Sequence, residues 1–385
     1  MYKRFLILFS IVFFVFVNSK KSKAQNERKF SNAFDYNTSY TGDFVYNIDG
    51  GIKTGSTYMG LLNFNLGFDT KKAGLWNNGY FFAMLSDTHG RSLSEHYIGD
   101  FQVSSNIDGG KNFYFQELWY SHKFFQFSFI LGIQDLNVEF ANSNCGGLFI
   151  NSSFGIMPTL ATNANANAPI FPLTTLGFTF KWDINENWTW KNAIYDGQPF
   201  NNGEKFLNFE WDSNDKDGGL FISEMQYSFS TDNEHSSVIK VGTYLHHKHI
   251  SAGNNEGVII DKYINGIYSI ADLHIWNSGN KSLDAFTQIG FSPSKNIEVD
   301  YYLGGGINYT GLFNRKNRDV AGIAVNVLHF NMRDDSEAVV ELTYQYNFSS
   351  KIYLQPDLQY IINPMGTDIN LNNSFVGFLR FGFNF

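Results

Sequence analysis

Histidine and acidic side chains are the groups in this sequence that could bind a metal or act in catalysis. His246, His247 and His249 form the densest histidine cluster, and on a strand His247 and His249 share a face. No acidic or cysteine partner stands at a convincing spacing for a metal, which favours solvated histidines at a strand end. His329 and Asp334 are the residue types of a hydrolytic site that pairs an acid with a histidine. No other feature of the sequence supports such a site. We therefore predict no enzyme activity, no catalytic residue, no metal site and no cofactor.

A larger set of polar residues stands at alternate positions of apolar segments. Within residues 337–347, Glu341 and Gln345 alternate with Leu342 and Tyr344. Amides, carboxylates and aromatic rings bind and stack on neutral hydroxylated solutes, whereas a ring of one charge sign would select ions. For each residue the alternative is simple solvation or a cross-strand pair. The polar set that we predict to face an aqueous interior and contact solutes includes Glu117, Gln134, Asp135, Glu298, Asp300, Glu341, Gln345, Asp357, Gln359 and Arg380.

Residues 135–172 form the longest segment without a strand pattern. The segment contains an Ala/Asn tract at 161–168 and two prolines, Pro169 and Pro172. Loops longer than ~15 residues without their own structure are usually functional or disordered. We expect this loop to fold inward and constrict an interior, with an external lid as the alternative. Its candidate constriction residues are Asn151, Ser152, Ser153, Phe154 and Phe171.

Period-two alternation recurs along the chain and defines the elements that must position these residues. Leu62, Phe64, Leu66 and Phe68 share one face of a segment whose other face carries polar residues and glycine. This alternation predicts strands with one apolar and one polar face. We expect about 16 strands, near 42–49, 57–69, 79–88, 112–121, 125–134, 173–182, 188–196, 219–229, 237–248, 263–276, 282–291, 297–309, 319–330, 337–347, 351–362 and 374–385.

The connections between these strands distinguish a barrel from a sandwich. Odd-numbered connections include the long ones (89–111, 135–172 and 197–218), and even-numbered connections are nearly all short. Outer-membrane barrels alternate short periplasmic turns with longer extracellular loops. So many strands enclose more space than side chains can fill. The predicted fold is an all-β transmembrane antiparallel barrel with a water-filled lumen and an inward-folded constriction loop.

The last strand supports the same architecture. Phe375, Leu379, Phe381 and Phe383 share a face, and Phe385 is the final residue. A closed barrel leaves no unpaired edge in lipid. The terminal aromatic resembles the signal read by the bacterial outer-membrane assembly machinery, which we predict as a partner alongside outer-membrane lipid.

The N-terminal residues have the features of a secretory signal peptide. Lys3 and Arg4 precede an apolar stretch, and Ser22-Lys23-Ala24 suits signal peptidase. We expect residues 1–24 to be a signal peptide and residues 25–385 to be one barrel domain in a Gram-negative-type outer membrane. The formal net charge is −8, and the leader carries basic residues without acids, so the mature chain is more acidic and nucleic acid is a poor partner. The lone Cys145 excludes a disulfide framework.

Several blocks resemble the carbohydrate-selective porins of the OprB family. They lie at Gln116–Tyr120, Gly132–Asp135, Phe149–Gly155, Phe171–Gly177, Tyr195–Pro199, Arg318–Gly322 and Leu354–Pro364. The resemblance implies a sixteen-stranded monomeric barrel that passes sugars through a loop-narrowed eyelet with charged residues. Arg91, Arg333 and Arg380 are candidates for the family's eyelet arginines.

We therefore predict passive diffusion of mono- or oligosaccharides across the outer membrane. The alternatives are a general, mildly cation-preferring porin and, less favoured, a barrel enzyme or adhesin. The sequence does not name the sugar.

Overall fold

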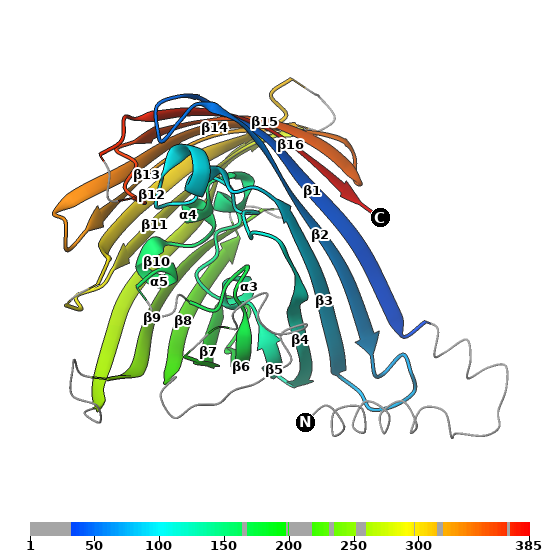
Figure 1. Ribbon diagram of the computed structural model, residues 1–385. Helices are drawn as coiled ribbons and strands as arrows, with labels where there is room; N and C mark the ends of the chain where they lie inside the picture. The colour runs from blue at the N-terminus through cyan, green and yellow to red at the C-terminus, as the bar shows by residue number, and fades with distance from the viewer. Residues whose placement is uncertain are drawn as a thin grey trace.

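Sixteen antiparallel strands close into one barrel in the computed structural model (Figure 1). The structure describes residues 32–163, 168–197, 199, 218–230, 235–251, 259–295, 297–313, 319–367 and 370–385, without the side chains of 248–251 and 259–261. The predicted signal peptide and most of the 197–218 connection lie outside these residues. Each strand pairs with its neighbour in sequence, and β1 pairs with β16 to close the wall. The strands are β1 (Phe34–Asp49), β2 (Gly55–Asp69), β3 (Gly79–Gly90), β4 (Asn112–Phe124), β5 (Phe127–Gln134), β6 (Thr175–Asp183), β7 (Trp188–Asp196), β8 (Gly219–Ser230), β9 (Ser236–Ser251), β10 (Ile259–Ser278), β11 (Lys281–Phe291), β12 (Val299–Thr310), β13 (Asp319–Phe330), β14 (Asp335–Ser349), β15 (Ile352–Ile362) and β16 (Ser374–Asn384).

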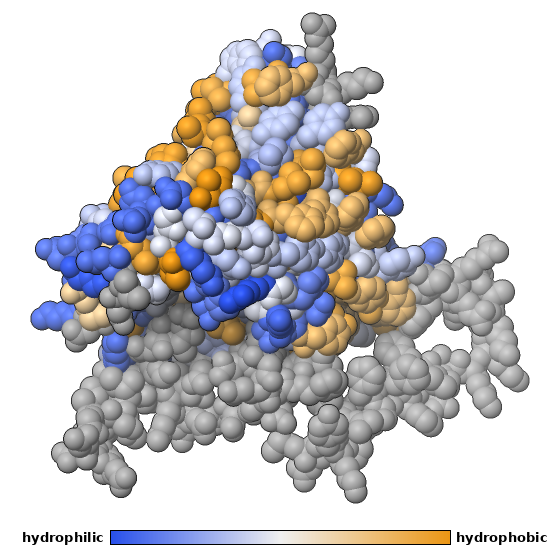
Figure 2. Space-filling view, turned by 45° about the horizontal axis from the view of Figure 1, so that its top comes forward, coloured by the Kyte–Doolittle hydropathy of each residue, from blue (hydrophilic) through white to orange (hydrophobic). Residues whose placement is uncertain are grey.

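The alternation in the sequence becomes an apolar outer face and a mixed inner face. On β14, Leu342 is 53% exposed, whereas its neighbour Glu341 is fully buried. Successive side chains of a strand point to opposite sides of the sheet, so one face of each strand meets lipid. Apolar side chains gather over the outer face of the molecule in Figure 2. The predicted sixteen-stranded barrel is confirmed.

The two ends of the barrel differ in their connections. One end, here called the short-turn end, carries the N-terminal start of β1, the C-terminus and tight turns such as residues 125–126 and 279–280. The opposite end, the long-loop end, carries residues 91–111 and 135–174. The largest departure from the expected boundaries is at β1, which begins at Phe34 rather than near residue 42. Outer-membrane barrels likewise carry their longest loops at one end.

The two long loops lie inside the barrel, where they form short helices. The 91–111 loop contains η1 (Ser94–Ile98). The 135–174 loop contains α3 (Leu136–Glu139), η2 (Gly146–Leu148), α4 (Ser152–Gly155) and α5 (Pro158–Ala161), and α3, α4 and α5 are visible within the wall in Figure 1. Among the residues with described positions, no helix is long and apolar enough to span a bilayer.

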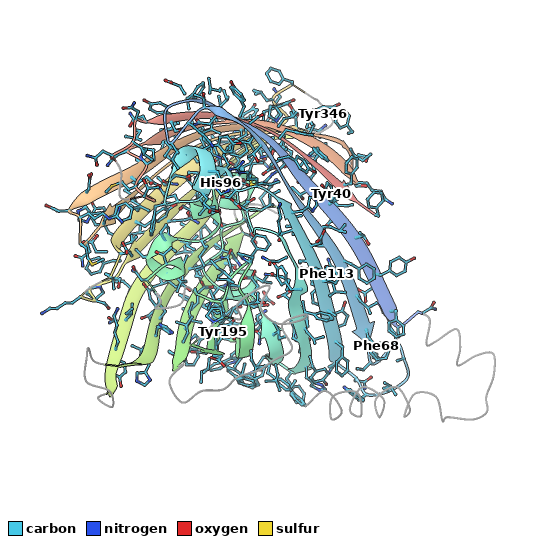
Figure 3. The ribbon with its side chains drawn as sticks, viewed as in Figure 1. Tyr40, Phe68, His96, Phe113, Tyr195 and Tyr346 are labelled. Atoms are coloured by element: carbon cyan, nitrogen blue, oxygen red, sulfur yellow. The ribbon has the colours of Figure 1, made fainter. Side chains whose placement is uncertain are left out.

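An apolar core joins the 135–174 loop to the inner wall. Leu136, Phe140 and Leu160 of the loop pack in one buried cluster with wall residues such as Ile222 and Phe330. Glycine lets α5 approach closely, since a Cβ on Gly290 of β11 would lie 2.2 Å from the Thr159 hydroxyl oxygen. Tyr195 of β7 points into this region, whereas Phe113 lies on the outer surface (Figure 3). The barrel therefore buries an ordinary packed core on one side of its interior, which the sequence had not indicated.

Candidate functional site

The two internal loops face each other across a cavity of about 480 Å³, here called the aperture. Residues 101–108 line one side, and parts of residues 135–173 line the other. The loops touch directly, because the Ser152 N–H donates to the Val103 carbonyl oxygen at 3.0 Å. The Asn106 N–H likewise donates to the Ile150 carbonyl at 2.8 Å. Both loops therefore set the size of the aperture.

The lining of the aperture combines aromatic, amide, hydroxyl and carboxylate groups. Phe101 and Phe171 supply rings, and Asn106 and Asn137 supply amides. Phe171 lies against Gly109, where a Cβ would be 2.9 Å from the ring. Asp108 and Asp135 supply carboxylates, and no lysine or arginine occurs among the described lining residues. This chemistry suits neutral hydroxylated solutes better than anions.

Asp135 organises the start of the 135–174 loop. Its carboxylate caps α3 by accepting from the Asn137 N–H at 2.9 Å, and it also accepts from the Phe171 N–H at 3.0 Å and the Gln116 amide at 2.8 Å. Burial raises the pKa of the Asp135 carboxyl to about 6, although these hydrogen bonds oppose the shift. Burial also raises the pKa of Asp108 at the same cavity. The aperture therefore carries acids that gain protons more readily than exposed ones.

Wall carboxylates hold the 135–174 loop in place. Glu341 accepts from the Ile150 and Asn151 N–H groups at 2.5 and 3.0 Å. Asp272 of β10 accepts from the Ser143 hydroxyl at 2.5 Å and from the Asn144 N–H at 2.9 Å. Hydrogen bonds to charged groups each stabilise by roughly 1.5–3 kcal/mol. These acids are therefore loop anchors more than solute contacts.

Neutral wall side chains add further anchors for this loop. Gln288 donates to the Phe154 carbonyl at 2.9 Å, and Gln355 donates to the Leu148 carbonyl at 2.8 Å. The Tyr302 hydroxyl donates to the Ser153 carbonyl at 2.8 Å. Backbone groups that leave water on entering the lumen thus regain partners on the wall.

The 91–111 loop has its own anchors. The Phe101 and Gln102 N–H groups donate to the Glu337 carboxylate of β14 at 2.9 Å each. Arg380 of β16 makes a two-point ion pair with Asp43 of β1 at 2.7 and 2.8 Å and donates to the Asn106 side-chain oxygen at 2.8 Å. Arg380 thus joins the closing strands of the barrel to the rim of the aperture.

The remaining predicted wall residues occupy varied positions. Gln134 is buried and bonds across to β6 through the Thr179 hydroxyl and the Gly177 carbonyl, both at 2.7 Å. Gln359 donates to the Ser104 carbonyl at 2.9 Å and so holds the 91–111 loop. Glu117 of β4 and Asp357 of β15 are buried in the inner wall, 5% and 3% exposed. Gln345 borders a separate cavity at the short-turn end.

The predicted inward position of Asp300 is corrected. A register shift between Val299 and Tyr301 changes the phase of β12. Asp300 therefore meets the Nδ1 of His329 at 2.7 Å, and His329 stacks on Tyr301 with ring centroids 4.9 Å apart. Tyr301 is 42% exposed on the outer side of the wall. Glu298 lies in the connection before β12, at the long-loop end.

Four of the five constriction-loop candidates lie at or near the aperture. Ser152, Ser153 and Phe171 line it. Asn151 caps α4 by accepting from the Ser153 N–H at 3.1 Å. Phe154 instead packs away from the cavity, on Phe149 and Phe286 with ring centroids 5.2 and 6.0 Å away.

The structure also identifies site residues that sequence reasoning missed. Glu224, Asp272 and Glu337 anchor the loops, and Phe101 and Asp108 line the aperture. The available signal for the three anchors was an acid at an inward position of a strand, the pattern that singled out Glu341. Nothing in the 91–111 segment distinguished it as a second inward loop.

None of the three candidate arginines lines the aperture. Arg91 lies over the Tyr97 ring at 5.8 Å, and Arg333 donates to the Met365 carbonyl at 2.9 Å, so neither lines the aperture. Within the described part of the chain, no group of three or more histidine, cysteine or acidic residues could hold a metal ion. The His249 side chain lies outside that part.

Comparisons with known proteins agree with this architecture. Among solved structures, OprB of Pseudomonas putida at high pH superposes with a TM-score of 0.80 at 18% identity, covering 93% of this chain and 96% of that chain. An anion-selective porin from Comamonas acidovorans gives a TM-score of 0.58 at 11% identity, covering 91% and 99%. The outer membrane channel DcaP of Acinetobacter baumannii gives 0.57 at 9% identity, covering 91% and 97%. At these identities the likeness shows a shared fold.

A comparison with curated protein sequences found no match. The family model of the carbohydrate-selective porins, OprB family, matches residues 53–385, which is most of the chain and nearly the whole barrel. The chain therefore belongs to the OprB family of carbohydrate-selective porins and is a β-barrel of the outer membrane, with sugars as its diffusing solutes.

Proposed function

We propose that sugars cross this porin through the aperture between the 91–111 and 135–174 loops. The observation that carries the proposal is the lining, where the Phe101 and Phe171 rings lie among amides, hydroxyls and two carboxylates. Sugar rings present both C–H faces and hydroxyl groups, so aromatic and polar partners together bind them weakly. Weak and repeated contacts let a solute enter and leave, as conduction requires.

The 135–174 loop acts in this proposal as the constriction. Its support is the set of wall anchors, since Glu341, Asp272 and Gln288 each fix a different stretch of loop backbone. A loop held at several points excludes solutes by size more sharply than a loose one, because its backbone does not yield.

A general porin with mild cation preference is the second candidate. Asp108 and Asp135 line the aperture, and lysine and arginine are missing from its described lining. Carboxylates at a narrow opening attract cations and repel anions. Sugar permeation and cation preference are compatible, so the two candidates differ in whether sugars interact with the wall.

Planar-bilayer conductance with added sugars separates these candidates. We expect transient, concentration-dependent block of the ionic current by D-glucose or maltose. An ohmic current that sugars leave unchanged would support the general porin, and the absence of any current would support a plugged barrel. Liposome swelling with sugars of graded size then measures the size limit.

Three further assignments belong to this proposal. Residues 1–24 are removed as a signal peptide, which leaves residues 25–385 as the barrel domain. The C-terminal strand ending at Phe385 is recognised by the outer-membrane assembly machinery. The protein works as a channel, without catalysis or a cofactor.

A further inference from the structure

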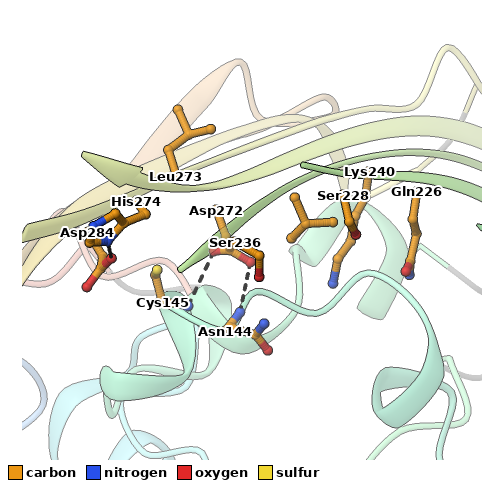
Figure 4. A pocket seen from close by; sticks show the side chains of 11 residues that line it. Asn144, Cys145, Gln226, Ser228, Ser236, Lys240, Asp272, Leu273, His274 and Asp284 are labelled. Atoms are coloured by element: carbon orange, nitrogen blue, oxygen red, sulfur yellow. Dashed lines mark hydrogen bonds and ion pairs between the residues drawn. The ribbon is translucent and has the colours of Figure 1, made fainter. Parts of the chain in front are cut away.

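A second polar cavity lies inside the barrel, separate from the aperture. It has a volume of about 260 Å³ and is lined by residues of β8–β11 near the short-turn end, with Asn144 and Cys145 of the 135–174 loop facing these strands (Figure 4). It shares no lining residue with the aperture, although Asn142 and Ser143, which line the aperture, directly precede Asn144 and Cys145 in the chain. The loop segment 142–145 therefore contributes to both cavities, and the second cavity is bounded by wall residues near the short-turn end.

The side chains of this cavity are fixed by bonds to groups around it. Lys240 donates to the backbone and side-chain oxygens of Asn142 at 2.8 and 2.5 Å. The side-chain nitrogen of Gln226 donates to the Glu224 carboxylate at 2.6 Å, so the Gln226 side-chain oxygen takes no part in this bond. The Nδ1 of His274 meets Asp284 at 2.7 Å, and the His274 ring stacks on His235 with centroids 4.0 Å apart. Such supported side chains are pre-organised, so a ligand spends little free energy on ordering them.

The mixture of charges indicates which class of ligand fits. Asp272 and Asp284 oppose an anion, and the Lys240 ammonium opposes a cation. The serine hydroxyls of Ser228 and Ser236, with the Gln226 amide, both donate and accept hydrogen bonds. Neutral sugar hydroxyls match this lining because each also donates and accepts. The volume is near the lower end of ligand pockets, typically ~300–1,000 Å³, and so suits a single sugar ring.

We propose that this cavity is a second sugar subsite, which takes one neutral monosaccharide unit after the aperture. The proposal rests on the proposed function, since a sugar must reach the lumen to bind there. Two weak sites in series hold a solute in the pore while leaving each step reversible.

Cysteine protection tests the subsite. In a Cys145→Ser background, Ser228→Cys and, separately, Ser236→Cys place a reactive thiol on the cavity wall. Asn347→Cys, on β14 beside a different cavity at the same end, is the matched control. The rate of modification by a small neutral methanethiosulfonate is measured with and without saturating D-glucose. We expect D-glucose to slow modification about threefold or more at positions 228 and 236, and to leave position 347 unchanged.

Two outcomes would overturn the subsite, and a third would overturn its ligand class. Unchanged rates at both positions 228 and 236 would overturn the subsite, as would equal slowing at position 347. Equal protection by D-glucuronate, which is anionic, would overturn the assignment to neutral sugars. Liposome swelling by D-glucose, measured on the same variants, keeps the two proposals distinguishable. Swelling without protection removes only the subsite, whereas absence of swelling and of current block removes the proposed function.

Discussion

Glu341 accepts hydrogen bonds from two consecutive backbone N–H groups of the 135–174 loop, and it is fully buried. Because the group is buried and bonds to the loop backbone, it holds the loop rather than meeting a solute. Asp272 does the same for residues 143–145. At the scale of single residues, acids on the inner wall thus fix the position of the loops, which form the constriction in the proposed function.

Glu341→Gln is the sharpest test of this role. Glutamine keeps one acceptor oxygen but turns an NH₂ group toward a buried N–H donor, so one loop N–H loses its partner. We expect the free energy of unfolding to fall by about 1–3 kcal/mol. Single-channel recordings should also show larger and noisier open-channel current because the loop is less firmly held. Glu298→Gln, outside the strands, is the control and should change neither quantity; an unaltered channel in Glu341→Gln would refute the anchoring role.

Phe171→Ala tests the aromatic contact proposed at the aperture. The ring lines the cavity and lies against Gly109. Loss of about 1 kcal/mol of ring contact corresponds to roughly fivefold weaker sugar block of the current. Phe313→Ala removes a ring that is 78% exposed on a turn at the short-turn end and should leave the block unchanged. Block of equal strength in Phe171→Ala and wild type would mean that sugars do not stack there.

At the scale of elements, the aperture carries its own pH dependence. Burial raises the pKa of Asp135 to about 6, above its value in the unfolded chain. The folded state therefore binds this proton more tightly, and the carboxyl becomes neutral as the pH falls through about 6. We expect the cation preference, measured as a reversal potential in a KCl gradient, to decline as the pH falls below about 6. Asp135→Asn should already show a weaker preference at neutral pH and a smaller decline; a decline as large as in wild type would assign the titration elsewhere.

The elements also show how far the sequence could be interpreted. Period-two alternation predicted strands such as β13 and β14 closely, since lipid imposes an apolar residue at every second position. The inner face has no such rule. Val339 and Ile361 face inward and bury themselves against loop residues such as Ile98 and Ile150, which alternation alone does not reveal. The shift in β12 that carries Asp300 outward is a local backbone irregularity without a sequence signature here.

At the scale of the whole molecule, closure joins the two ends of the chain. β1 and β16 pair from Ser39 to Asp49, and Phe385 exchanges backbone hydrogen bonds with Thr38 at 2.8 and 3.4 Å. The buried ion pair of Asp43 and Arg380 lies within this seam and also holds Asn106. The strand pair that removes the last open edge therefore also positions the 91–111 loop. The closing strand could be predicted from the sequence. Its link to the aperture could not, because Arg380 bonds to Asp43 and Asn106, which lie 337 and 274 positions away along the chain.

Phe385→Ala separates closure from recognition by the assembly machinery. The substitution keeps the backbone that bonds to Thr38 and removes a ring that is 71% exposed, so closure should survive it. Refolding into detergent, followed by heat-modifiable gel mobility, should match wild type, while the folded barrel in cell outer membranes should fall several-fold. Phe313→Ala, also an exposed ring, should lower neither. If refolding in detergent failed as well, the ring would be contributing to closure itself; normal amounts in the membrane would mean that the assembly machinery does not read this residue.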